Sequence, residues 1–282
     1  MEEGDRERKK ERKRKENEKE SERQREKRER ERENGISLFH MSSLSSLQIN
    51  KPLDGLGRTP LIVACDVGAD RRIIEILIKA GAKLEAKDRW GWTALHWAVK
   101  RNHLHAVEIL LSRGSEVNPR DKAGRTPLHL ACYWGYLHTV EILLGHNGID
   151  VNVVANNGYT PLHEGVRGPS SCKYEVVCAM LKQDSVNLEI VNKEYRTPLL
   201  EAVSDGHLGI MQRLIARGAN VNVVEHGGNN CLHLALKREN NFHSEVEHMT
   251  MLDQVSFHIV CDYVCVCVCV CVCVCICASV CV

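Results

Sequence analysis

Apolar and polar positions follow a pattern along this chain that recurs every 33 to 37 residues. Each copy has a polar turn, a short helical pattern that opens on Thr-Pro-Leu-His or a variant of it, and a second helical pattern that often ends in Gly. The copies begin at Asp54, Asp88, Asp121, Ala155, Asn192 and Glu225. Self-similarity at this period predicts a solenoid of stacked units, and it directs the search for function to exposed positions on a repeated surface.

The third copy shows how one unit is built. Thr126 offers an N-cap hydroxyl, and the proline after it stands at the first helical position, where its missing N–H does no harm. Leu128, Ala131 and Cys132 form one apolar stripe, and a second, more apolar helix is predicted over 137–144. A helix pair this short cannot bury its apolar face alone, so its stability must come from stacking on its neighbours.

Two motifs recur in register along the chain. The first opens the short helix, as Thr59-Pro60-Leu61, Thr93-Ala94-Leu95-His96, Thr126-Pro127-Leu128-His129, Thr160-Pro161-Leu162-His163, Thr197-Pro198-Leu199 and the weaker Leu232-His233. The second ends the longer helix, as Lys79-Ala80-Gly81-Ala82, Ser112-Arg113-Gly114 and Ala216-Arg217-Gly218-Ala219. With these motifs the chain resembles the ankyrin repeat family. The resemblance implies an all-α ankyrin-repeat solenoid of stacked helix-turn-helix units with short hairpin-like turns, over residues 54–243.

Several copies depart from the pattern. Ile62 and Leu200 replace the motif histidine in the first and fifth copies. The fourth copy carries about three extra residues around 168–171, and it has Gly165 where the other copies have Ala. That glycine costs the helix about 0.5–1 kcal/mol. The sixth copy is partial because it loses its second helical pattern, for which residues 244–252 are a candidate substitute.

The N-terminal region differs in composition from the repeats. Its first 33 residues contain 15 Lys/Arg and 13 Asp/Glu. Residues 1–35 are therefore predicted to be a disordered, charged low-complexity region, because they have too little apolar surface to bury. A long helix with many ion pairs is the alternative, although like charges four residues apart weaken it. Residues 36–53 are interpreted as a linker.

Residues 244–282 are predicted to be a poorly ordered tail that ends in a Cys-Val repeat. Length and hydropathy alone would predict a membrane span over 264–282, but flanking basic residues and an aromatic belt are missing from the sequence. Alternating cysteines also offer soft metal ligands, without the varied spacing that wraps a metal. Because TGT-GTG repeats encode Cys-Val in frame, we interpret residues after about Gln254 as retained intron or a gene-model error.

The sequence offers no support for catalysis. His96, His129, His163 and His233 occupy the same repeat position, which indicates an architectural role; the resemblance implies hydrogen bonding between adjacent loops. The sequence contains no phosphate-binding Gly-rich loop, no nucleophile elbow and no Cys-x-x-Cys pair. We therefore predict no catalytic residues, no metal site and no cofactor.

The resemblance implies that partners bind through turn tips and the exposed side of the first helices, which line a concave groove. The variable positions there give the predicted partner-binding residues, which are Arg89, Trp90, Trp92, Lys100, Arg101, Arg125, Tyr133, Trp134 and Tyr159. Trp, Tyr and Arg usually dominate interface energetics, so a partner segment, acidic and apolar, is expected across the second to fourth repeats. The alternative is that Trp90 and Trp92 only pack on neighbouring turns.

Three asparagines form a second group of candidates. Asn118, Asn152 and Asn222 each follow a Val and lie eight residues after a Leu. This context resembles that in which ankyrin repeats are hydroxylated on Asn. The alternative is a turn-capping asparagine with no modification.

These patterns predict a non-enzymatic, monomeric scaffold or adaptor that binds another protein. Beyond residue 33 the chain has 23 Lys/Arg (38 less 15) and 24 Asp/Glu (37 less 13), which argues against nucleic acid as partner of the repeats. Cys65 and Cys132 at small core positions suit reduced thiols, so the expected location is cytoplasmic and/or nuclear. The alternatives are the ankyrin portion of a larger protein such as a ubiquitin-ligase scaffold, and a membrane adaptor anchored by the tail. The identity of the partner depends on surface residues and not on the fold.

Overall fold

The computed structural model describes residues 49–239, and within that range the chain forms eleven α-helices and no strand. The all-α solenoid predicted from the repeat period is confirmed. The charged region 1–35, the first part of the predicted linker, the candidate helix 244–252 and the Cys-Val tail lie outside the described residues.

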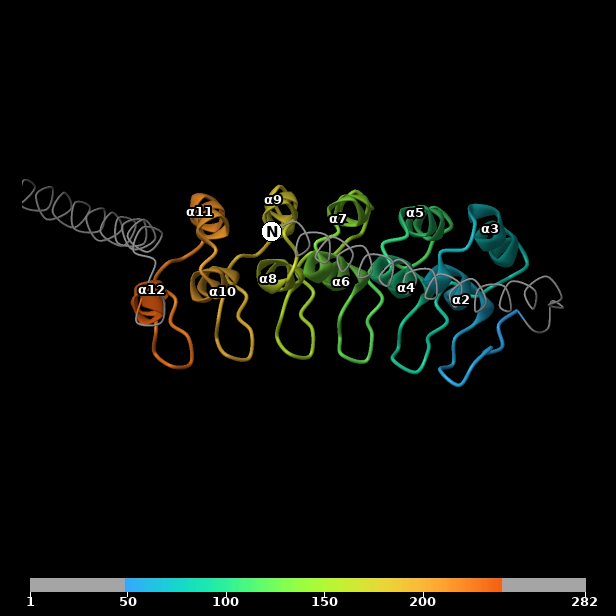
Figure 1. Ribbon diagram of the computed structural model, residues 1–282, viewed down its shortest axis with the longest axis horizontal. Coiled ribbons are helices and arrows are strands. Elements are labelled where there is room, and N and C mark those ends of the chain that lie inside the picture. The colour runs from blue at the N-terminus through green and yellow to red at the C-terminus, as the bar shows by residue number, and fades with distance from the viewer. Residues whose placement is uncertain (1–48, 240–282) are drawn as a thin grey trace, which may run out of the picture.

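The helices form two parallel rows with the turns projecting on one side (Figure 1). The inner row, beside the turns, consists of α2 (Pro60–Val67), α4 (Ala94–Lys100), α6 (Pro127–Trp134), α8 (Pro161–Arg167), α10 (Pro198–Asp205) and α12 (Cys231–Glu239). The outer row consists of α3 (Arg71–Lys79), α5 (Leu104–Ser112), α7 (Leu137–Leu144), α9 (Lys173–Leu181) and α11 (Leu208–Ala216). Each repeat therefore supplies one inner helix, and the first five also supply an outer helix.

Capping residues typical of helix ends begin and end the inner helices. Thr160 caps α8, where its hydroxyl accepts a hydrogen bond from the His163 backbone N–H at 3.4 Å. Gly135 ends α6 with a φ of 71°, a left-handed conformation that favours glycine. The chain can therefore reverse within two residues before α7 begins.

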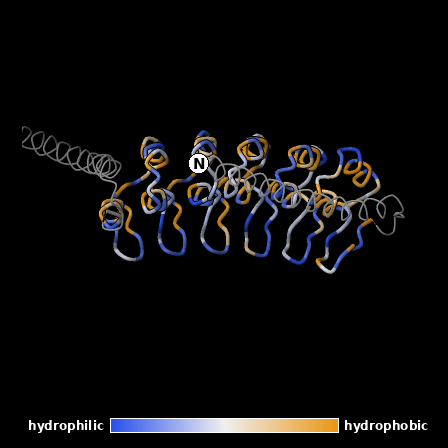
Figure 2. The backbone as a smooth tube through the Cα atoms, viewed as in Figure 1, coloured by the Kyte–Doolittle hydropathy of each residue, from blue (hydrophilic) through white to orange (hydrophobic). Residues whose placement is uncertain are grey.

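The core runs continuously between the two rows of helices. Leu95, Leu128, Leu162 and Leu199 open successive inner helices and are almost fully buried. The helices carry most of the hydrophobic residues, whereas the turn tips are largely hydrophilic (Figure 2). Ile49, which precedes the first turn, is also buried in this core. Because each repeat contacts only its neighbours, stability accumulates along the array.

The fourth repeat carries its extra residues between its two helices. Residues 168–172 separate α8 from α9, whereas only 135–136 separate α6 from α7. Gly168 lies close to the preceding repeat, and a Cβ there would fall 2.4 Å from the carbonyl oxygen of Tyr133. The insertion therefore folds against the third repeat and requires glycine at that point.

Candidate functional site

Buried histidines join successive repeats. His96 Nδ1 accepts a hydrogen bond from the Thr93 backbone N–H at 3.2 Å, so Nε2 carries the proton and donates to the carbonyl of Arg125 in the next repeat at 3.3 Å. His129 and His163 repeat this arrangement one and two units later. Burial lowers the pKa of all three imidazoles to about 4, which keeps them neutral at pH 7. The architectural role predicted for these three histidines is confirmed.

Asparagines join the repeats at a second point. Asn118 Nδ2 donates to the Gly148 carbonyl at 2.8 Å, and its Oδ1 accepts from the Asp150 backbone N–H at 3.0 Å. Asn152 makes the equivalent two bonds to the next repeat, at 2.7 and 2.8 Å. Asn222 is exposed near the end of the fifth repeat. The geometry gives Asn118 and Asn152 a structural role, and hydroxylation of the three remains a prediction.

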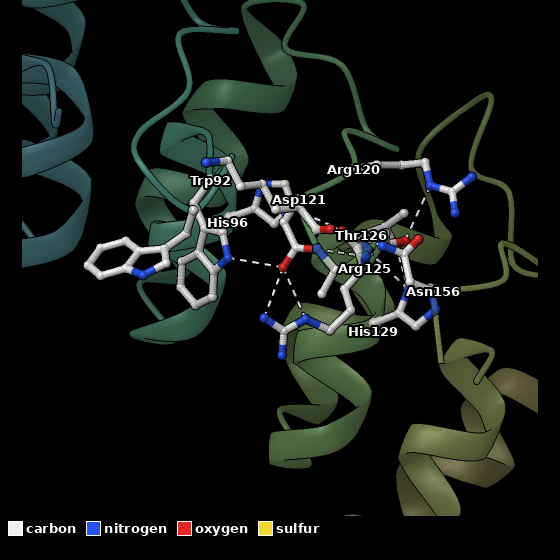
Figure 3. A network of polar contacts seen from close by, with 12 residues as sticks. Trp92, His96, Arg120, Asp121, Arg125, Thr126, His129 and Asn156 are labelled. Atoms are coloured by element: carbon white, nitrogen blue, oxygen red, sulfur yellow. Dashed lines mark hydrogen bonds and ion pairs between the residues drawn. The ribbon is translucent and has the colours of Figure 1, made fainter. Parts of the chain in front are cut away.

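Most turns open on a side chain that accepts hydrogen bonds, and Asp121 makes the most of them. Its Oδ1 accepts from the backbone N–H groups of Ala123 and Arg125, at 2.9 and 2.8 Å. Its Oδ2 accepts from the Arg125 guanidinium and, at 3.0 Å, from the indole N–H of Trp92 in the preceding repeat (Figure 3). In the fourth repeat this position is Ala155, which has no acceptor to offer.

A groove of about 660 Å³, here named the central groove, crosses the second to fourth repeats and reaches Lys193 at the start of the fifth. The inner helices and the turns supply its aromatic lining, which consists of Trp92, Tyr133 and Trp134. The Lys100 ammonium lies 3.7 Å from the centre of the Trp134 ring, a cation–π contact. This ring and the Tyr133 ring meet edge to face, with centroids 5.2 Å apart. The groove therefore presents rings and a cation side by side.

The charges that line the central groove are mostly positive. Its cations are Lys100, Arg125, Arg167 and Lys193, and its one carboxylate is that of Glu164. Burial lowers the pKa of Lys100, and the neighbouring arginines act in the same direction. Burial raises the pKa of Glu164, although Arg167 and Arg125 act against the shift. The groove favours a ligand that carries negative charge.

A second groove of about 400 Å³, the tryptophan groove, adjoins the central groove over the second and third repeats. Three indoles line it, those of Trp90, Trp92 and Trp97, and the last two meet edge to face with centroids 5.0 Å apart. The Trp97 indole N–H donates to Asp88 Oδ2 at 2.8 Å. Trp90 remains 45% exposed. This cluster thus combines two indoles that pack on each other, those of Trp92 and Trp97, with the exposed indole of Trp90.

The structure brings most of the predicted binding residues together. The central groove is lined by Trp92, Lys100, Arg125, Tyr133 and Trp134, and Trp90 lies in the adjoining tryptophan groove. The other three lie outside the two linings. Arg89 donates to the Gly55 carbonyl, Arg101 forms an ion pair with Asp66, and the Tyr159 hydroxyl donates to Glu201.

Sequence reasoning missed Trp97, Glu164 and Arg167. The first two occupy the same repeat position, four residues after the threonine slot, which holds Val, Trp, Leu, Glu, Glu and Leu in the six repeats. This variation in polarity distinguishes the position from the constant core positions of the repeat, and it could have identified both residues. Arg167 stands three residues further along the helix, one turn from Glu164, and its guanidinium lies 4.7 Å from the centre of the Tyr159 ring.

Two kinds of feature are absent from residues 49–239. That part of the chain contains no group of three or more His, Cys, Asp or Glu side chains placed to hold a metal ion. None of its helices combines the length and the hydropathy needed to cross a membrane.

Paired helices that stack in register, with grooves across their inner row and turns, define a repeat solenoid with a grooved surface. The chain matches the family model described as ankyrin repeats (3 copies) over residues 34–121, 114–190 and 170–247, which together exceed half of its length. The chain belongs to the ankyrin repeat family. The ankyrin fold is typical of protein–protein interaction modules.

Individual relatives cover different shares of the chain. It is 29% identical over 186 residues to the B-cell lymphoma 3 protein homolog of Mus musculus, which covers 66% of this chain and 34% of that protein. An ankyrin repeat protein of Rickettsia bellii is 46% identical over 55 residues, covering 19% of this chain and 30% of its own. The chain thus spans about a third of the length of these relatives.

Among solved structures, the chain is similar to the crystal structure of the ankyrin repeat domain of Bcl-3, described as a unique member of the IkappaB protein family. The TM-score is 0.62 at 23% sequence identity, and the match covers 78% of this chain and 91% of that domain. This likeness shows the fold.

Proposed function

We propose that this protein is a non-enzymatic scaffold or adaptor that binds a partner protein across its second to fourth repeats. The observation that carries the proposal is the central groove, where Trp92, Tyr133 and Trp134 line one surface with four cations. Aromatic and arginine side chains gathered in one groove are typical of interface hot spots. The buried histidines and the loop asparagines that hydrogen-bond successive repeats to one another hold this surface in register.

Charge indicates the kind of partner. The chain beyond residue 33 is nearly neutral, with 23 Lys/Arg (38 less 15) and 24 Asp/Glu (37 less 13), so the excess of cations over carboxylates in the grooves is local. Nucleic acid favours an extended basic surface, whereas a short acidic and apolar protein segment needs only a local one. We therefore propose a protein partner for a monomeric adaptor in the cytoplasm, the nucleus or both.

Truncation of two indoles, the exposed one of Trp90 and the half-buried one of Trp134, tests the proposal. The full-length chain with Trp90→Ala and Trp134→Ala is expected to fold and to bind its captured partners at least about 30-fold more weakly, the loss expected for one hot spot. Partners captured from a lysate by the wild type are identified by mass spectrometry, and their affinities are then measured with the purified proteins.

A matched control removes exposed apolar surface elsewhere. Ile76 and Tyr174 lie on the outer helices α3 and α9 and are 63% and 36% exposed. The double variant Ile76→Ala, Tyr174→Ala should keep the same partners at wild-type affinity. Undiminished binding by the folded Trp90, Trp134 variant would contradict the proposed surface.

A further inference from the structure

The two grooves are built from the same repeat positions, shifted by one unit. Trp90, Trp97 and Asp121 line the tryptophan groove. The equivalent positions one repeat later are Ala123, Leu130 and Ala155. Ala123 and Leu130 line the central groove, whose volume is about 660 Å³ against about 400 Å³ for its neighbour. The central groove is thus a larger version of the same site, with Ala123, Leu130 and Ala155 at the positions of two indoles and a carboxylate.

In the tryptophan groove, side chains of the protein itself supply both a hydrogen-bond acceptor and a packed ring. The Trp92 indole N–H and the Arg125 guanidinium both donate to Asp121 Oδ2, and the Asp121 side chain is 1% exposed. The Trp97 ring packs edge to face on Trp92. A ring and a carboxylate from the chain itself therefore occupy the space between the second and third repeats.

At the next junction Leu130 and Ala155 stand where Trp97 and Asp121 stand one repeat earlier, so these two positions supply neither a ring nor a carboxylate. Ala155 has no acceptor, and the lining holds four cations against the single carboxylate of Glu164. Arg125 reaches Asp121 through Nε and Nη2, which leaves Nη1 unengaged by that carboxylate. Lys193 is exposed at the far rim. The lining of the central groove therefore has three more cations than carboxylates (four less one), whereas that of the tryptophan groove has one more (two less one).

We propose that the central groove binds a partner segment in which an acidic residue stands next to a large aromatic residue. The carboxylate takes the place of the acidic side chain missing at position 155, and the ring fills the space that Trp97 fills one repeat earlier. This inference rests on the proposed function and specifies the chemistry of the partner. The complementary charge of the lining supports a peptide segment with one or two acidic residues.

A substitution that supplies the missing carboxylate from within the chain gives a direct test. Position 155 is 4% exposed, and acidic residues stand at its equivalents Asp54, Asp88 and Asp121, so Ala155→Asp is expected to fold. The probe is the fluorescein-labelled peptide Gly-Ser-Asp-Trp-Asp-Ser-Gly, compared with the same peptide carrying Asn for Asp. Fluorescence anisotropy with the full-length chain measures both affinities.

The wild type is expected to bind the Asp peptide about 10-fold more tightly than the Asn peptide, and Ala155→Asp should abolish that preference. Asn147→Asp is the matched control, because it adds the same charge at an exposed loop position after α7. It should keep the preference. Equal binding of the two peptides by the wild type, or an unchanged preference in folded Ala155→Asp, would overturn the proposal.

A second variant, Lys193→Glu, tests the proposal even if Ala155→Asp does not fold. Lys193→Glu changes an exposed side chain at the groove rim and should reduce the preference for the Asp peptide about 5-fold or more; an unchanged preference would count against the proposal.

The partner-capture experiment distinguishes failure of the acidic–aromatic proposal from failure of the proposed function. If the Trp90, Trp134 variant loses its partners while Ala155→Asp keeps both partners and peptide preference, only the acidic–aromatic proposal fails. If the Trp90, Trp134 variant also keeps its partners, the proposed function fails as well.

Discussion

The junction between the second and third repeats and the junction between the third and fourth share one framework and differ in their grooves. His96 and His129 cross the two junctions in the same way, each donating to a carbonyl of the next repeat. On the groove side, the first junction is filled by Trp97 and Asp121, whereas the second is open. The contacts that stack the repeats and the residues that shape the grooves thus occupy different repeat positions. The surface can change from repeat to repeat without loss of register.

Acid should weaken both junctions at once, because they share the buried histidines. The pKa of His96, His129 and His163 is lowered to about 4 in the folded chain, against the ordinary value of about 6.5 in the unfolded chain. Between these values the unfolded chain binds more protons. The stability from neutral imidazoles is therefore fully present above pH 6.5 and is lost as the pH falls towards 4. Urea unfolding at pH 7 and pH 5 should differ by several kcal/mol, with about 2 kcal/mol from each histidine.

Variants at one buried and one exposed histidine assign this pH dependence. His129→Gln should lower stability at pH 7 and reduce the difference between pH 7 and pH 5. His138→Gln, at an exposed position on α7, should leave that difference unchanged. A free energy of unfolding that stays constant from pH 7 to pH 5 would contradict the role given to the buried histidines.

A substitution at Asp121 should turn the filled junction into a copy of the open one. Asp121→Ala removes the acceptor of two backbone N–H groups, the Arg125 guanidinium and the Trp92 indole. We expect a loss of about 3 kcal/mol, because several buried donors lose a charged acceptor together. Chemical denaturation of the full-length chain measures it.

The exposed carboxylate of Asp184 provides the control for this loss. Its side chain is 99% exposed, so Asp184→Ala should change stability by less than about 0.5 kcal/mol. Equal denaturation midpoints for Asp121→Ala and Asp184→Ala would show that the Asp121 contacts do not hold the second and third repeats together.

Much of the shared framework could be predicted from the sequence because it depends on local, repeated chemistry. The Thr-Pro opening of α6 and α8 fixed the helix starts, and the recurrence of His96 and His129 at one position indicated an architectural role. The insertion at 168–171 also lies between the two helices, as its position in the pattern indicated. A period of about 33 residues repeats the same local signals, so each copy supports the interpretation of the others.

The grooves were harder to predict because they depend on several repeats at once. Trp97 was missed, since its place inside a helix gave no sign that its ring would meet Trp92 from the turn. Arg101 was predicted to bind a partner, yet it pairs with Asp66 of the preceding repeat. The lining of the central groove combines Ala123 and two rings of one repeat with the charged side chains of the next. Such a combination is visible only once the stacking places these residues together.

A glycine in the fourth repeat allows stability to be changed without altering either groove. The other repeats have Ala at the position of Gly165, and a Cβ there would lie 3.6 Å from side-chain carbons of Val176 and Val177 and 3.7 Å from Cys132. These are ordinary van der Waals distances, so α8 has room for the methyl group. Gly165→Ala should stabilise the chain by about 0.5–1 kcal/mol, because alanine loses less conformational entropy in a helix.

The same variant separates the framework from the binding surface. Gly165 lines neither groove, so Gly165→Ala should raise the denaturation midpoint and leave the affinity for the Asp peptide unchanged. Gly209→Ala is the comparison, because the added methyl group on α11 would meet the Tyr174 ring at 3.3 Å and gain less. A change in peptide affinity with Gly165→Ala would mean that the stacking of the fourth repeat also sets the width of the central groove. The division between framework and surface positions would then not hold at the open junction.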